Sequence, residues 1–247
     1  MISVLIISKN SEDFISDAIE SVKPIAEEII VVDDSNDNTP KIAEKLGAKV
    51  VKNTFKNFAD QRNLAASLAK NDWIFYLDSD ERVTPEFIKE LKDKMQNIKE
   101  DSDTAGFYVR RKTFFYGKDW GLTDRVQRVF RKDKLKEWRG VVHETPEVDG
   151  SLATISAPIL HHTHRRLDQM VSKTNEWSEF EAELRFKAGH PKMSVWRFPR
   201  VMSTAFLGSY FKEGGWKNGT AGVVEAVYQM FSMFITYAKL WEKQQKK

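Results

Sequence analysis

The first hundred residues alternate short apolar runs with stretches in which apolar side chains recur every three or four positions. The runs predict buried strands at 2–7, 28–33, 49–52 and 73–78, and the stretches that follow them predict helices. Residues 84–86, Thr-Pro-Glu, form a typical helix start, with a capping hydroxyl, a proline and an acid in the first turn. Strands that alternate with helices in this way predict a parallel sheet covered by helices on both faces.

A different pattern begins after residue 100. Alternating apolar and polar residues predict further strands, at 106–116, 126–131, 141–144 and 154–161. Two long helical segments follow, at 167–188 and 222–243, and an irregular stretch with several glycines separates them. We therefore expect an α/β domain over residues 1–165 and a C-terminal helical extension over residues 166–247.

Polar residues follow several of the predicted strands at the point where each strand ends. They are Asn10, Asp33, Asp34, Asp78 and Asp80. In parallel α/β sheets, ligands bind beyond the carboxyl ends of the strands. Two carboxylates one residue apart after a buried strand repel each other and lose hydration unless a cation joins them. Because Mg²⁺ and Mn²⁺ suit one or two carboxylates plus substrate phosphates, the sequence predicts a metal–diphosphate site at this edge.

Composition narrows the class of protein. The 247 residues are 30% charged and 41% hydrophobic, which is ordinary for a globular protein. The net charge of +3 is too small to indicate a nucleic-acid partner, and the absence of cysteine excludes disulfides and thiolate metal sites. No apolar run reaches the ~18 residues that a membrane-spanning helix needs, and we expect no secretory signal.

Four segments of the predicted α/β domain together resemble inverting family 2 glycosyltransferases. They are ISVLIISKN (2–10), VVDDSNDNT (31–39), FADQRNLA (58–65) and LDSDER (77–82). Three later segments resemble a bacterial subgroup that includes lipopolysaccharide core β-glucosyltransferases: WGLTDRVQRVFR (120–131), VVHE (141–144) and ILHHTHR (159–165). The resemblance implies a GT-A fold, in which a Rossmann-like, mostly parallel sheet binds a nucleotide sugar.

The resemblance also implies which residues hold the donor, for which UDP-glucose is the favoured choice. An acid at the end of the second strand would accept hydrogen bonds from the uracil or the ribose. The loop after this strand is one residue shorter than the family pattern, so Asp33 and Asp34 both remain candidates. Asn10, Arg62 and Arg128 are further donor-binding candidates, the arginines as partners of phosphate.

The Asp-x-Asp pair would hold the metal in a protein of this family. The second acid, here Asp80, would ligate Mg²⁺ or Mn²⁺, and the first, here Asp78, would reach the donor ribose or the metal shell. His161 matches a family histidine and is a third candidate for the metal or the diphosphate. The ion would stabilise the negative charge that develops on the leaving nucleoside diphosphate.

Inverting transfer also needs a base. A single in-line displacement requires a carboxylate that takes the proton of the acceptor hydroxyl, opposite the leaving group. Glu144 is the first candidate, with His143 as its neighbour, and Asp124 is the reserve. The implied acceptor is a hydroxyl of a cell-surface glycan or of a lipid-linked acceptor such as lipopolysaccharide core.

The last quarter of the chain is basic and aromatic. From residue 185 onward, eleven Lys and Arg residues stand against three acids, which gives a net charge of +8. The aromatics of this segment could pack the last helices on the first domain, form a homodimer interface or face an anionic membrane. We favour peripheral membrane contact, in a cytoplasmic protein at the inner membrane, because the implied acceptors are often lipid-linked.

Two other functions compete with glycosyl transfer. A sugar nucleotidyltransferase would also use a metal and acids on an α/β sheet, but it would carry a glycine-rich, basic loop after the first strand. Residues 8–12, SKNSE, contain no glycine. A non-catalytic nucleotide-sugar-binding scaffold would be expected to lack one or more of the site acids, yet Asp33, Asp78, Asp80 and Glu144 are all present.

Overall fold

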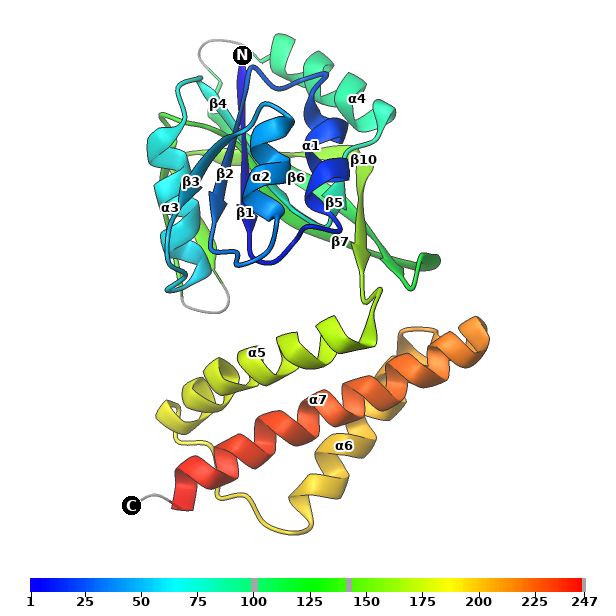
Figure 1. The fold of residues 1–247 in the computed structure, drawn as a ribbon. Helices are drawn as coiled ribbons and strands as arrows, with labels where there is room; N and C mark the ends of the chain where they lie inside the picture. Colours follow the sequence, from blue (N-terminus) through cyan, green and yellow to red (C-terminus); the bar gives the residue numbers. More distant parts are fainter. Residues whose placement is uncertain (99–101, 141–143, 246–247) are drawn as a thin grey trace. The chain divides into compact units, whose positions relative to one another are not determined.

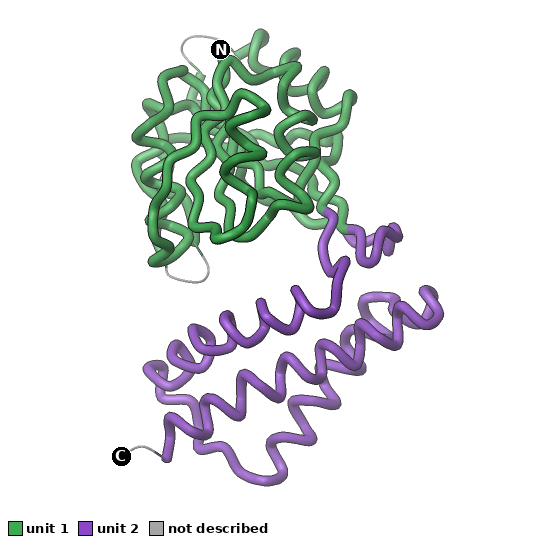
Figure 2. The backbone as a smooth tube through the Cα atoms, viewed as in Figure 1, with its two compact units in different colours: residues 1–113, 123–161 green, residues 114–122, 162–247 purple. Residues whose placement is uncertain are grey.

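The structure is a computed structural model that describes residues 1–98, 102–140 and 144–245. The chain divides into two compact units (Figure 2). Unit 1 comprises residues 1–113 and 123–161, and unit 2 comprises residues 114–122 and 162–247. Residues 114–122, which fall within the predicted first domain, therefore group with the C-terminal helices.

The predicted parallel strands form one half of the main sheet. They are β1 (Ile2–Ser8), β2 (Glu28–Asp33), β3 (Lys49–Lys52) and β4 (Trp73–Asp78). β1 pairs in parallel with β2 on one side and with β4 on the other, and β3 pairs in parallel with β2. This arrangement confirms the predicted α/β class.

Antiparallel strands extend the sheet beyond β4. The order β3-β2-β1-β4 continues with β7 (Lys118–Arg131), β6 (Thr104–Phe115), β10 (Ser151–Thr163) and the two-residue strand β5 (Glu81–Arg82). A separate hairpin, β8 (Leu135–Arg139) with β9 (Thr145–Val148), was not predicted. The predicted strand at 141–144 lies outside the described residues except for Glu144, which is not in a strand.

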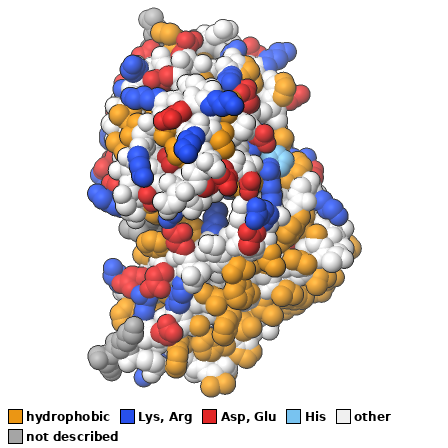
Figure 3. Space-filling view, viewed as in Figure 1, with side chains coloured by type: hydrophobic (Ala, Val, Ile, Leu, Met, Phe, Trp, Pro, Cys, Tyr) orange, Lys and Arg blue, Asp and Glu red, His pale blue; other side chains and the backbone are white. Residues whose placement is uncertain are grey.

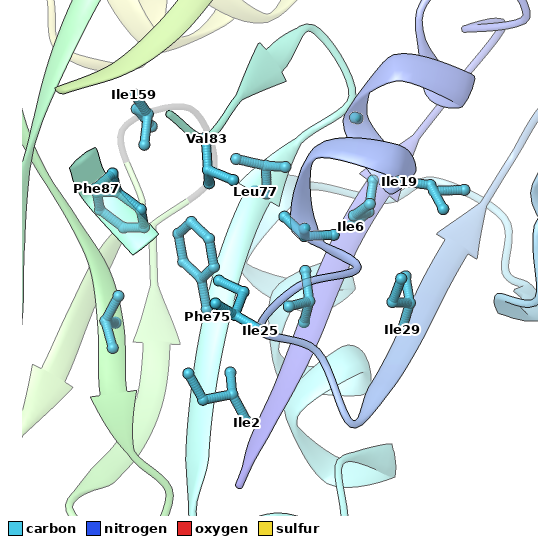
Figure 4. Packing of buried hydrophobic residues seen from close by; sticks show 14 of the residues in the cluster. Ile2, Ile6, Ile19, Ile25, Ile29, Phe75, Leu77, Val83, Phe87 and Ile159 are labelled. Atoms are coloured by element: carbon cyan, nitrogen blue, oxygen red, sulfur yellow. The ribbon is translucent and has the colours of Figure 1, made fainter. Parts of the chain in front are cut away.

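Successive side chains of the central strands point to opposite faces of the sheet, and because both sets are apolar, helices cover both faces. The helices of unit 1 are α1 (Ile15–Val22), α2 (Thr39–Lys45), α3 (Phe58–Leu68) and α4 (Pro85–Gln96) (Figure 1). Val4 and Ile6 of β1 belong to one buried cluster, with side chains of α1, α2 and α4 (Figure 4). Leu5, which points to the opposite face, belongs to a second cluster with side chains of α3. Thr84 caps α4 as predicted, because its hydroxyl accepts a hydrogen bond from Phe87 N at 3.1 Å.

Unit 2 is largely helical. It contains α5 (Leu167–Lys187), α6 (Arg197–Leu207), a π-helical turn η1 (Gly208–Lys212), a 3₁₀ turn η2 (Gly215–Asn218) and α7 (Gly219–Gln245). The prediction of an irregular stretch between two helices was therefore wrong for α6. Phe198 and Val201 of α6 pack against a buried cluster that includes Tyr237 of α7, and this contact could not be read from local spacing. In the described part of the chain, no helix is long and apolar enough to cross a membrane.

Candidate active site

The parallel strands bring polar residues to one edge of the sheet. The register places Asp33, at the end of β2, and Asp78, at the end of β4, beside the last residues of β1, which lies between these strands. Asn10 follows β1 in a left-handed conformation, with φ of +49°. Its side-chain oxygen accepts a hydrogen bond from Asn36 N at 2.9 Å, and this bond ties the loop after β1 to the loop after β2. Asn10 thus shapes the edge of the sheet at which α/β proteins bind ligands.

A chain of alternating acids and arginines starts at this edge. In order of contact, its members are Glu144, Arg62, Asp78, Arg128, Glu81, Arg111 and Asp124. Arg62 donates one hydrogen bond from Nε to Glu144 and another to Asp78, each at 3.1 Å. Arg128 donates to Asp78 and to Glu81, to the latter at 2.8 Å. Both arginines are buried, and each of them bridges two acids.

The other end of this chain engages Asp124. Arg111 lies 3.4 Å from Glu81 and donates two hydrogen bonds to Asp124, at 3.0 and 2.6 Å. Both carboxylate oxygens of Asp124 are thereby bound to one guanidinium. The structure thus places the two base candidates, Glu144 and Asp124, at opposite ends of one chain of ion pairs.

Aromatic side chains and the unpredicted hairpin hold Arg62 in place. The guanidinium of Arg62 lies 4.9 Å from the ring centroid of Trp138 and 5.5 Å from that of Tyr76. The hydroxyl of Tyr76 donates to the carbonyl oxygen of Arg62 at 3.0 Å. Asn63 exchanges two hydrogen bonds with the backbone of Trp138, at 2.9 and 2.7 Å. These contacts fix α3 against β8, so that Arg62 can reach Asp78 and Glu144 together.

The arginines decide the charge state of Asp78. Burial opposes ionisation of this carboxyl, but the guanidinium groups of Arg128 and Arg62 outweigh burial and hold the pKa of Asp78 well below its usual range. Burial likewise opposes the charge on Arg128, yet Asp78 and Glu81 raise the pKa of Arg128 above its usual value. Asp78 is therefore ionised and already engaged by two cations. Arg128, which the sequence suggested as a phosphate contact, is instead buried between two acids.

Asp80 faces a histidine, whereas Asp78 and Glu81 are bound by arginines. Its Oδ2 lies 3.3 Å from Nε2 of His161, and Nδ1 of His161 lies 3.5 Å from the hydroxyl of Thr113. The pairing of β5 with β10 brings this about, because Glu81 and His161 are opposite each other in the register. In the described residues, no group of three or more His, Cys, Asp or Glu side chains converges on a metal position. Asp80 and His161 thus form a two-residue donor set.

The two acids after β2 have different surroundings. Asp33 is 2% exposed, and its carboxylate accepts hydrogen bonds from Ser8 Oγ, Ser35 Oγ and Ser35 N, at 2.6, 2.6 and 3.0 Å. The side chain of Asp34 is 25% exposed and accepts from Phe55 N at 3.2 Å. Asp33 thus holds the loop together from inside, whereas Asp34 keeps an exposed edge.

Comparison with known proteins identifies the family. The family model described as Glycosyl transferase family 2 matches residues 3–161, which include the sheet edge and the chain of ion pairs. This chain belongs to glycosyl transferase family 2. An uncharacterized glycosyltransferase of Rickettsia conorii is 31% identical to it, over 98% of this chain and 90% of the relative. The lipopolysaccharide core biosynthesis glycosyltransferase LpsC of Rhizobium meliloti is 26% identical, over 98% of this chain and 92% of LpsC.

Solved structures resemble this family 2 glycosyltransferase more distantly. A glucosyl-3-phosphoglycerate synthase of Mycobacterium tuberculosis, in complex with Mn²⁺, UDP and glucosyl-3-phosphoglycerate, is 18% identical, with a TM-score of 0.49. The alignment covers 79% of this chain and 82% of the synthase.

Two members of the site were not among the sequence candidates. Glu81 is fully buried, and besides its contacts with Arg128 and Arg111 it accepts a hydrogen bond from Asp78 N at 3.0 Å. An acid directly after the Asp-x-Asp pair was a signal for Glu81, but in sequence it is also typical of a solvated turn before a helix. Arg111 lies in a strand with neighbouring basic residues, and only its contacts distinguish it from them.

Proposed function

We propose that this glycosyltransferase transfers a sugar, with inversion, from a nucleotide-sugar donor to a hydroxyl group of a cell-surface glycan or lipid-linked acceptor. UDP-glucose is the proposed donor and lipopolysaccharide core the proposed acceptor. The likeness to LpsC, which is named for lipopolysaccharide core biosynthesis, supports this acceptor class. The proposal rests on one observation: a single sheet edge presents a partly exposed acid, an acid–histidine pair and a carboxylate held by arginine.

Asp34, rather than Asp33, is the proposed nucleoside contact. The carboxylate of Asp33 already accepts three hydrogen bonds within the protein, and burial leaves it little surface for a ligand. Asp34 is partly exposed, and Lys9 Nζ, which lies 4.0 Å from Asp34, also lies 5.6 Å from the ring centroid of Phe55. An acid beside an aromatic ring and a cation suits a nucleoside, because the base can stack while its N–H or a ribose hydroxyl donates to the carboxylate.

Asp80 and His161 are the proposed metal ligands. Two ligand atoms that lie about 2.1 Å from an ion in adjacent octahedral positions are about 3 Å apart, which agrees with their 3.3 Å separation. Asp78 is less suited to this role, because Arg62 and Arg128 already bind its carboxylate. Mg²⁺ or Mn²⁺ bound by this pair would take its remaining ligands from the diphosphate and water, and would stabilise the negative charge of the leaving group.

Glu144 is the proposed base. The acceptor oxygen would form a bond to the anomeric carbon of the donor while the bond from that carbon to the diphosphate oxygen breaks. The acceptor proton would pass to Glu144, and the nucleoside diphosphate would leave with the bonding electrons. The hydrogen bond from Arg62 Nε orients the carboxylate of Glu144 through Oε1. Asp124 is the weaker candidate, because Arg111 binds both of its oxygens.

A thermal-shift panel tests donor binding first. UDP, UDP-glucose, UDP-galactose, UDP-GlcNAc, GDP-mannose and dTDP-rhamnose are each tested with Mn²⁺ and with EDTA. A ligand present at 100 times its Kd stabilises the native state by about 2.7 kcal/mol, so a donor should raise Tm by a few degrees. We expect the UDP series alone to do so, and only with Mn²⁺. If no nucleotide shifts Tm, the proposed donor class is wrong.

Matched variants then test the individual roles. Asp80→Asn should lose the Mn²⁺-dependent shift, whereas Asp93→Asn, an equivalent change on α4, should keep it. Glu144→Gln should keep the shift and lose at least about 100-fold in transfer to lipopolysaccharide core acceptor, whereas Asp124→Asn should retain transfer. The reverse result would make Asp124 the base. Donor binding by the wild type without transfer or UDP release would indicate a scaffold, and pyrophosphate release from UTP and a sugar phosphate would indicate a nucleotidyltransferase.

A further inference from the structure

Helix α7 exposes an apolar stripe along most of its length. Val223, Val227, Phe231, Phe234 and Trp241 are between 36% and 46% exposed. Their spacing places all five on one face of the helix. Exposed apolar surface of this extent indicates a surface that is covered in the working protein.

This face carries no compensating charge. Between residues 219 and 238, Glu225 is the one charged residue of the sequence, and it is 1% exposed. Its carboxylate lies 2.9 Å from Nδ1 of His164 and accepts a hydrogen bond from Gln229 at 2.7 Å. The side chain that could make α7 polar is therefore turned inward, and the outward face stays apolar.

The segment that precedes α7 adds large exposed side chains. Trp196, Leu207, Phe211 and Trp216 are between 53% and 59% exposed, and they lie at the ends of α6 and in the turns that join it to α7. α6 has no fully buried residue. In the space-filling view, hydrophobic side chains gather over unit 2, whereas charged side chains are spread over unit 1 (Figure 3).

A groove between α5 and α7 continues the apolar surface. Its volume is about 710 Å³, and Leu167 and Val171 of α5 line it together with Phe231 and Ile235 of α7. Phe231 belongs to the stripe as well as to the groove, so the two surfaces are continuous. A groove of this kind can receive flexible hydrocarbon, because its walls are mainly aliphatic and aromatic.

Basic side chains accompany the exposed tryptophans. The guanidinium groups of Arg197 and Arg200 lie 4.9 and 6.0 Å from the ring centroid of Trp196, and Lys217 Nζ lies 5.2 Å from that of Trp216. Residues 191–218 contain five basic residues and one acid, Glu213. Tryptophan and basic residues beside an apolar face are typical of surfaces that lie at the boundary of an anionic bilayer.

We propose that the face formed by α7, the turns η1 and η2 and the ends of α6 docks on an anionic lipid surface. The apolar stripe would enter the boundary between headgroups and acyl chains, and Arg197, Arg200, Lys212 and Lys217 would meet lipid phosphates. A second copy of the chain suits this face less well, because a two-fold interface would bring like-charged patches together. The helix would lie along the surface, which agrees with the finding that no described helix can span a membrane.

Vesicle co-sedimentation of the full chain tests this proposal without reference to turnover. We expect binding to phosphatidylcholine vesicles that contain about 30% phosphatidylglycerol, and weak binding to phosphatidylcholine alone, because each basic residue near an anionic surface adds to affinity. Raising the salt concentration should weaken binding. Equal partition to the two vesicle types, or no partition to either, would overturn the proposal.

Variants locate the docking face. Phe231→Glu with Phe234→Glu, and separately Arg197→Glu with Arg200→Glu, should each lower the partition coefficient at least about tenfold. Lys41→Glu with Lys45→Glu on α2 makes in unit 1 the same charge change as the double arginine variant and should lower the partition coefficient less than about threefold. Circular dichroism and the UDP thermal shift confirm that each variant is folded. Unchanged vesicle binding by both unit 2 variants would refute the lipid surface as the occupant. A wild-type protein that binds no lipid and forms a dimer, which the unit 2 substitutions dissociate, would refute it as well.

Discussion

Replacing Arg128 with methionine should destabilise unit 1 by about 3 kcal/mol at pH 7. At an effective dielectric constant of about 20, unit charges about 4 Å apart interact by about 4 kcal/mol, and removing one partner of a buried ion pair costs about 3–5 kcal/mol. Arg128 binds two acids, which argues for a large effect. Asp78 keeps Arg62 and Glu81 keeps Arg111 in the variant, which argues for the lower end of this range.

A second feature of Arg128 also favours the lower value. Its Nε–H is buried without a hydrogen-bond partner in the part of the chain that the structure describes. An unsatisfied buried donor costs about 1–3 kcal/mol, and Arg128→Met removes that cost together with the ion pairs. We therefore expect about 3 kcal/mol rather than 5 kcal/mol.

Urea unfolding followed by circular dichroism measures the loss of stability. Hydrogen exchange of peptides from β1 and β4 reports on unit 1 separately, because two compact units need not unfold together. Arg131→Met is the matched control: Arg131 is on the same strand and pairs with the exposed Asp133, so its loss should cost less than about 1 kcal/mol. Equal losses for Arg128→Met and Arg131→Met would refute the reasoning.

The pH dependence of the free energy of unfolding gives a second check on the same ion pairs. The pKa of Asp78 in the folded protein lies below its ordinary value, so its ionised form stabilises the native state. This contribution is fully present above about pH 5 and is lost as the pH falls below about 4, through the folded-state pKa. The stability difference between wild type and Arg128→Met should therefore be constant near neutral pH and shrink in acid. A difference that grows below about pH 4 would contradict the assigned charge of Asp78.

Two further pairs of variants test the donor pocket and the packing of unit 2. Asp34→Asn should weaken UDP binding at least about fivefold with little change in stability. Asp33→Asn should instead lower stability by about 1–3 kcal/mol, because it disturbs three buried hydrogen bonds. Calorimetry measures UDP binding and urea unfolding measures stability, so the two outcomes can be told apart. Gly222→Ala should destabilise unit 2 by about 1–3 kcal/mol, because a Cβ there would overlap the carbonyl oxygen of Gly215. Gly208→Ala, with open space around the added carbon, should change Tm by less than about 2 °C.

The sequence was sufficient to predict the parallel half of the sheet. Each of the four strands is a short apolar run bounded by polar or turn-forming residues, and α1 buries Ile15, Ala18, Ile19 and Val22 on one apolar face, so local spacing indicated these elements. The edge of the sheet that carries the site could then be predicted as well, because residues directly after parallel strands share one edge of a sheet. The motifs around Asp33 and Asp78 also indicated the family that the comparison confirms.

Elements that depend on distant partners were harder to predict. The helix α6 is short, has no fully buried residue and is held by contacts with α7. Its apolar residues Phe198, Val201 and Ala205 do recur at helical spacing, and the prediction of an irregular stretch missed this local signal. The hairpin β8–β9 carries Trp138, which packs on Tyr76 and Arg62 of other elements. Nothing in the local pattern of residues 135–148 indicated this packing.

By itself, then, the sequence determined the order of the parallel strands and of the helices in unit 1, the family, and the placement of Asp33, Asp34, Asp78 and Asp80 at one edge. Only the tertiary structure decided what each acid does. Asp78 meets arginines that are 16 and 50 residues away, Glu144 meets one that is 82 residues away, and Asp80 faces His161. The charge, the orientation and the available ligand positions of a carboxylate depend on its neighbours in space, and the fold brings these neighbours together from separate parts of the chain.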